Sequence, residues 1–258
     1  MSRISAIAFN TFREAVRDRV LYNLIVFAIL IIGSSLLFGQ ISIGVEKLVL
    51  INLGLTSISL FGIIIAIFIG IQMVSKEIEK RTLYTVLAAR PVSRWEFILG
   101  KEFGLVGTLA VNASLMALGF FAALFYLTHK FVPADAYLFV ALYFILLQFV
   151  LITSLALFFS TFSSPLMSSI FTFALFVIGT FAEDLRGFAA MAGGATKIVS
   201  TTLAYLVPNF AALNVITQVA HGIPVQGRLI LMNSLYVLVY AGAITSAAVL
   251  VFERRNLK

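Results

Sequence analysis

Long apolar segments without charge alternate with short polar connections along the whole chain. Two long uncharged stretches run from Leu48 to Ser75 and from Ala136 to Ala182. A run of about 18 apolar residues is long enough to cross a hydrocarbon core as a helix. The pattern predicts an all-α, polytopic membrane protein with six transmembrane helices. These are expected at about residues 20–38, 52–74, 103–128, 137–161, 166–182 and 229–252.

The residues before the first span predict a helix at the membrane surface. Phe9, Phe12 and Val16 recur at helical spacing, while Arg13 and Glu14 occupy other faces. An amphipathic helix of this kind lies in the interface with its apolar face towards the lipid. We therefore expect residues 1–19 to form an amphipathic helix on the cytoplasmic leaflet. The first span is too long for a signal peptide and is expected to be retained.

The connection at residues 75–101 is the most informative segment between spans. Thr82 can cap a short helix, which Pro91 ends. Its apolar face consists of Leu83, Val86 and Leu87, and Arg90 extends that row by a turn. A short helix with so small an apolar row is not stable alone, so it should dock on a protein partner, on lipid headgroups or on the chain's own spans.

A second helix is expected to follow directly. Ser93 and Glu96 have the spacing of a capping box, which predicts a helix that runs straight into the third span. In that helix Gly100 and Gly104 match a helix-contact pattern, a weak signal in so apolar a chain.

The connection before the last span, residues 183–228, is unusually long. Pro208, Gly222 and Pro224 interrupt it. We expect an external connection of short helices folded back against the outer surface and partly dipping into the bilayer. A seventh span there would place the basic tail outside, so six spans are preferred.

Composition supports a single transmembrane domain over residues 1–258. Hydrophobic residues make up 61% of the chain and charged residues 11%, against roughly 25% charged in soluble domains. The mean hydropathy is +1.08. The chain therefore leaves no room for a separate hydrophilic domain.

The basic residues predict the orientation. The formal net charge is +7, and Lys and Arg accumulate on the cytoplasmic side of membrane proteins. Six spans place both termini on one side, with the 75–101 connection. That side carries 13 of the 18 basic residues, so both termini are expected to be cytoplasmic.

Catalytic and metal-binding patterns are missing from the sequence. There is no cysteine, the glycines around Lys101 do not form a phosphate-binding loop, and His129 and His221 are isolated. The expected span interiors contain no ionisable residue, which argues against an enzyme and against ion-driven transport. Energy for uphill transport would then enter from outside the membrane.

Uncharged polar residues within the spans allow two interpretations. They can hydrogen-bond between helices, which is the more common role, or line a weakly polar path. The candidates for a path are Thr56, Ser59, Asn112, Gln148, Ser169 and Thr172.

Several segments together resemble one family. Residues 77–101, with Arg81-Thr82-Leu83, Arg90-Pro91 and Leu99-Gly100-Lys101, resemble the signature of type-2 ATP-binding-cassette (ABC) permeases, which are exporter-type subunits. The tail at residues 252–257 is also similar. Residues 10–18 and 206–222 resemble the branch grouped with multi-copper-enzyme and nitrous-oxide-reductase maturation permeases. Arg81 departs from the glycine that many members carry there.

The resemblance implies that the membrane path and the ATPase activity belong to separate chains. Residues 82–90 would be the coupling helix, seated in a separate cytoplasmic ATPase that binds ATP and Mg²⁺, while this chain binds no cofactor and is not an enzyme. The residues assigned to this contact are Glu77, Arg81, Thr82, Leu83, Val86, Leu87, Arg90, Pro91 and Arg94. A second copy or a homologue would complete the path in a bacterial cytoplasmic membrane, with no role for nucleic acid. A non-transporting membrane scaffold and an ion-coupled secondary carrier are the alternatives.

Overall fold

The computed structural model describes residues 3–17, 45–79, 93–130 and 132–254, with a few single positions between 25 and 37. Throughout this part of the chain the regular structure is helical, without strands. Four of its helices are long and apolar enough to cross a membrane, and a bent pair makes a fifth candidate. The protein is therefore all-α and polytopic. The first predicted span, residues 20–38, falls almost wholly outside the described residues, so six spans remain a prediction.

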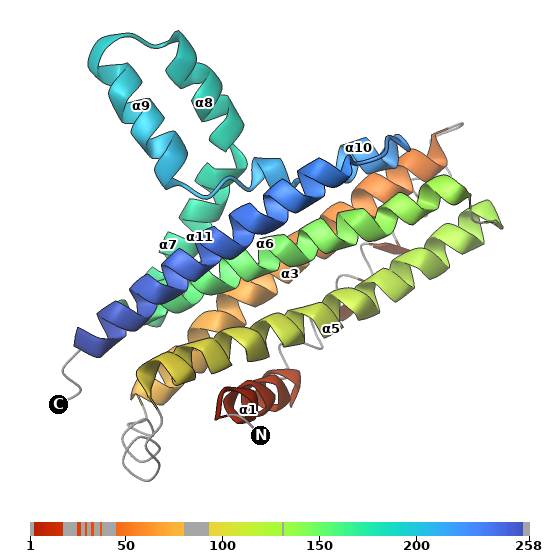
Figure 1. Ribbon diagram of the computed structural model, residues 1–258. Helices are drawn as coiled ribbons and strands as arrows, with labels where there is room; N and C mark the ends of the chain where they lie inside the picture. Colours follow the sequence, from red (N-terminus) through yellow and green to blue (C-terminus); the bar gives the residue numbers. More distant parts are fainter. Residues whose placement is uncertain are drawn as a thin grey trace.

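Four long helices run side by side (Figure 1). They are α3 (Glu46–Glu79), α5 (Arg94–Thr128), α6 (Tyr137–Ser160) and α11 (Gly227–Arg254). We call the end where α3 ends, α5 begins and α11 ends the basal end, and the opposite one the distal end. Each of the four covers one of the expected spans almost entirely. The shorter α7 (Pro165–Thr180) packs on α6 and α3.

Helix α6 is the centre of the bundle because it is apolar on nearly all faces. It contacts α3, α5, α7 and α11. Its approach to α3 is close at Gly62, where an added Cβ would lie 1.9 Å from the ring of Phe149. Near this contact the Ser59 hydroxyl donates a hydrogen bond of 2.7 Å to Gln148. Glycine is required here because the aromatic ring occupies the volume of a side chain.

The long connection before α11 begins with a bend of 58° between α7 and α8 (Ala182–Met191). Helices α8 and α9 (Gly194–Leu206) form a hairpin that stands away from the bundle (Figure 1). Its base is held where the Phe210 N–H donates to the Gly179 carbonyl at 3.0 Å and the Tyr240 hydroxyl donates to the Leu206 carbonyl at 2.7 Å. The short helices expected in this connection are present, but this hairpin does not fold back on the bundle.

The remainder of that connection does return to the bundle. The 3-10 turn η2 (Ala211–Leu213) contacts α6, and α10 (Ile216–Ala220) packs on α3 and α6. Gln148 links α6 to η2, because its amide nitrogen donates a hydrogen bond of 3.2 Å to the Leu213 carbonyl.

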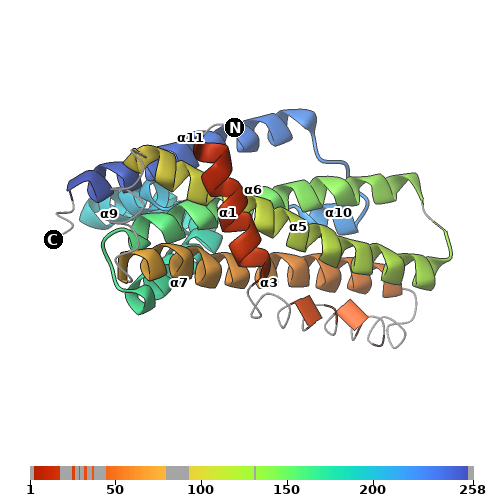
Figure 2. The ribbon, with the colours of Figure 1, turned by 90° about the horizontal axis from the view of Figure 1, so that it is seen from below.

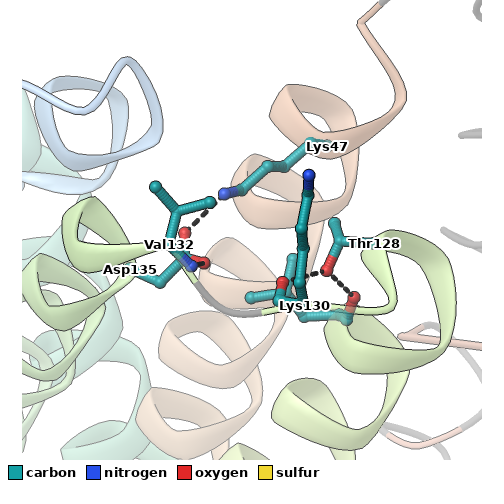
Figure 3. A network of polar contacts seen from close by, with 6 residues as sticks. Lys47, Thr128, Lys130, Val132 and Asp135 are labelled. Atoms are coloured by element: carbon teal, nitrogen blue, oxygen red, sulfur yellow. Dashed lines mark hydrogen bonds and ion pairs between the residues drawn. The ribbon is translucent and has the colours of Figure 1, made fainter.

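A group of polar contacts among Lys47, Val132 and Asp135, here called the clasp, lies at the distal end (Figure 3). The Lys47 ammonium lies 2.5 Å from one carboxylate oxygen of Asp135, and the other oxygen accepts the Val132 N–H at 2.9 Å. Asp135 belongs to η1 (Pro133–Ala136), the turn before α6. The clasp joins the start of α3 to the α5–α6 connection, although a partly exposed ion pair contributes only about 1 kcal/mol or less.

Candidate functional site

The basal end is the candidate functional site because the 75–101 connection leaves and rejoins the bundle there. Most of the residues assigned to the ATPase contact lie outside the described residues: Arg81, Thr82, Leu83, Val86, Leu87, Arg90 and Pro91. For Glu77 the structure describes only a helical backbone position in α3. Arg94 is described in full, so the geometry of this site begins where α5 begins.

Arg94 joins the start of α5 to the end of α11. Its guanidinium donates to the carbonyl oxygens of Phe252 and Glu253, each at 2.6 Å, and lies 5.7 Å from the centre of the Phe252 ring. The last carbonyls of a helix lack partners within it and carry partial negative charge, so a cation there satisfies and stabilises them. Residues 158 positions apart in sequence are thereby fixed together.

A small apolar cluster reinforces this junction. The rings of Phe97 and Phe252 stack with centroids 5.9 Å apart. Ile98 and Ala248 are buried beside them. The end of α11 is therefore held to α5 by packing as well as by Arg94.

The capping signal at Ser93 is confirmed. Helix α5 begins at Arg94 and continues to Thr128. The Glu96 carboxylate accepts the Ser93 backbone N–H at 2.9 Å and the Ser93 hydroxyl at 2.6 Å. Arg3 lies 3.8 Å from the same carboxylate. The return from the connection into the membrane is thus a single helix with an ordered start.

The helix α1 (Arg3–Arg17) lies across α5 (Figure 2). An added Cβ on Gly100 would lie 2.7 Å from the Ile7 side chain. One on Gly104 would lie 2.6 Å from the backbone oxygen of Ala8 and from Thr11. The weak glycine pattern of the sequence therefore marks a real helix contact, whose partner is α1.

The face of α1 that meets α5 overlaps only in part with the apolar row that the sequence emphasised, because Phe12 is half-buried near Gly107 of α5. Phe9 is 60% exposed, whereas Thr11 and Ala15 are fully buried. Small side chains allow the close crossing, and Phe9 remains free for another apolar environment.

One buried acid contradicts the expectation that the span interiors contain no ionisable group. Glu102 is 8% exposed, and its two oxygens accept hydrogen bonds from Ser154 at 2.6 Å and Thr245 at 2.7 Å. It therefore ties α5 to α6 and α11. The sequence interpretation placed the boundary at residue 103, but α5 starts nine residues earlier and carries Glu102 into the bundle. The sequence signal that could have placed Glu102 inside this helix was the capping box at Ser93, because the helix that follows it is uninterrupted.

Within the part of the chain that the structure describes, the six candidate path residues have different surroundings. Ser59 and Gln148 bond to each other between helices. Ser169 and Thr172 donate to carbonyls of their own helix, and Thr56 is exposed. Asn112 is buried, and neither of its amide atoms has a hydrogen-bond partner among the residues that the structure describes.

A comparison with family models decides the assignment. The model of the ABC-2 family transporter proteins matches residues 5–257, which include all the described helices except the first two residues of α1. The chain belongs to the ABC-2 transporter family. This ABC-2 permease is thus a membrane component of an ABC transporter and a multi-pass membrane protein. The match supports the type-2 permease resemblance without distinguishing the maturation-permease branch. No curated protein matches the chain.

Replacing Arg94 tests the junction between α5 and α11 of the ABC-2 permease. Arg94→Met should lower the free energy of unfolding by about 1–2 kcal/mol, because two carbonyls lose a charged donor. Thermal unfolding of the purified protein in detergent measures the change. Arg228→Met is the matched control at the other end of α11, where a cation opposes the helix dipole. Equal losses in the two variants would show that Arg94 does not cap this helix.

Proposed function

We propose that this ABC-2 permease is the membrane subunit of an ATP-driven exporter in a bacterial cytoplasmic membrane. Two copies, or this chain and a homologue, form the substrate path, and both termini face the cytoplasm. ATP and Mg²⁺ are bound by a separate ATPase, which docks on the helix expected at residues 82–90. Membership of the ABC-2 family and the charge distribution of the connections support this reading.

The observation that carries the proposal is the junction at Arg94. The coupling segment re-enters the bundle at a residue that also holds the last turn of α11. Glu102, two turns further along α5, bonds to α6 and α11. A force applied to residues 82–90 would therefore move α5, α6 and α11 together rather than bend one helix. Such rigid-body movement is what alternating access requires.

The test is recruitment of the ATPase. Leu83→Glu combined with Leu87→Glu places two carboxylates on the expected docking face and should abolish co-purification of a cytoplasmic ATPase from native membranes. Membrane insertion should be unchanged. Thr85→Glu adds one carboxylate to the opposite face of that expected helix and should retain the ATPase, as a control for added charge.

ATP turnover separates this proposal from its alternatives. An exporter should hydrolyse ATP in a substrate-dependent manner once the complex is reconstituted. Normal recruitment by the double variant would refute docking at residues 82–90. A bound partner without turnover would favour a scaffold, and flux driven by an ion gradient without ATP would favour a secondary carrier.

A further inference from the structure

A groove of about 700 Å³ runs between α5 and α11. Trp95 and Glu253 lie towards its basal end, Val106 and Leu238 lie deeper in the bundle, and α6 contributes Val150. The volume falls within the range of pockets that bind small molecules, about 300–1,000 Å³. None of the six candidate path residues is among the described residues that line the groove.

The groove has the length of an elongated ligand and faces away from the core. At 1.5 Å per residue, its walls extend about 16 Å along α5 and about 22 Å along α11. Several residues of its rim are widely exposed, including Phe103 at 61% and Leu238 at 65%. In a membrane such a rim faces lipid, so an apolar molecule can reach the groove from the bilayer.

Glu102 is a buried acidic side chain that lines the groove. The hydroxyls of Ser154 and Thr245 hold its two oxygens, and no lysine or arginine of the described chain forms an ion pair with it. A carboxylate oxygen has two acceptor sites, so each oxygen can accept one more hydrogen bond. A charge in the membrane is costly and commonly functional. A ligand that brings a cation would offset that cost.

The position of Glu102 within the groove defines the ligand further. On α5 it lies between Leu99 and Val106, and on α11 its partner Thr245 lies between Leu238 and Val249. Apolar walls therefore extend in both directions from the carboxylate. A lipid with a polar headgroup at one end would leave one of these stretches unmatched, and an anionic amphiphile would be repelled.

We propose that the groove between α5 and α11 binds a lipophilic amine from the membrane. Its ammonium group pairs with Glu102, and an apolar arm on each side of the nitrogen lies along the groove. The assignment rests on shape and charge complementarity alone. It is independent of export, since binding needs neither ATP nor a partner chain.

The single tryptophan of the chain makes binding directly measurable. Trp95 lines the groove, so its fluorescence reports occupancy without a label. The full chain in lipid nanodiscs is titrated with dihexylamine, which is cationic at neutral pH, and with the uncharged dihexyl ether. Empty nanodiscs give the background. We expect saturable binding of the amine at least about tenfold tighter than of the ether, equivalent to about 1.4 kcal/mol.

Two variants locate the site. Glu102→Gln keeps the size of the side chain and can still bond both hydroxyls, accepting from one and donating to the other, and should reduce the affinity for the amine to that for the ether. Gly242→Leu extends a side chain from the groove wall, and its Cβ has room because no atom lies within 4 Å of that position. It should weaken both probes at least about tenfold. Gly119→Leu, on an equally open position of α5 outside the groove, is the matched control.

Three results would overturn the proposal. They are equal affinities of the wild-type protein for amine and ether, an unchanged affinity for the amine in both groove variants, and a fluorescence change that never saturates. Thermal unfolding of each variant establishes that it is folded. If Glu102→Gln fails to fold, Gly242→Leu with the amine and ether pair still decides the outcome.

Discussion

Gly104→Ala should release α1 from α5 and lower the free energy of unfolding by about 1–3 kcal/mol, the usual cost of overpacking. The added methyl group would lie 2.6 Å from the backbone oxygen of Ala8, and a backbone atom cannot move aside as a side chain can. Either α1 shifts as a whole or it undocks. Thermal unfolding in detergent and the rate of trypsin cleavage at Arg13 measure both outcomes.

The same helix offers a matched control for this prediction. Gly107→Ala adds an identical methyl group one turn away, where the nearest atom of Phe12 is at 3.9 Å, an ordinary van der Waals distance. This variant should be neutral or slightly stabilising, because alanine favours a helix more than glycine does. If both variants have the same stability and cleavage rate, the close crossing at Gly104 is not what holds α1.

Gly62→Ala should cause a loss of similar size in the centre of the bundle. The new Cβ would lie 1.9 Å from the ring of Phe149, which is itself 1% exposed and surrounded by packed side chains. The ring must turn into space that neighbours occupy, or α3 must move away from α6. We expect a decrease of about 1–3 kcal/mol in the free energy of unfolding.

A double-mutant cycle identifies the cause. Phe149→Leu alone should destabilise by removing buried ring atoms, but in the Gly62→Ala background it should restore part of the lost stability. Gly119→Ala is the control, because a Cβ there meets open space. Strict additivity of the two core substitutions would show that their side chains do not compete for the same volume.

The sequence predicted the local features of this permease well. Hydropathy placed four spans on α3, α5, α6 and α11, since a membrane helix satisfies its own backbone hydrogen bonds and needs only length and apolarity. The start of α5 was nevertheless nine residues before the expected boundary. The Ser93 cap correctly set the start of α5, because a capping box acts over three residues. The loop signature and the chain ends led to the ABC-2 family.

The sequence interpretation failed where a residue's role depends on distant partners. Glu102 lies one residue before the expected start of the third span, yet its hydroxyl partners come from α6 and α11. The glycine pattern at Gly100 and Gly104 was too weak to assign a partner, and that partner proved to be α1. Arg94 was assigned to the ATPase contact, which stays untested, while its bond to the end of α11 was unforeseen.

The sequence by itself therefore determined the class of this protein, the extent of most of its long helices and the family to which it belongs. These properties depend on summed hydropathy and on signals a few residues long. Only the tertiary structure decided that Arg94 caps α11, that small residues seat α1 on α5, and that the buried carboxyl group of Glu102 lines a groove between α5 and α11. Such contacts join residues far apart in the chain, and helical periodicity specifies which face is apolar but not which helix will cover it.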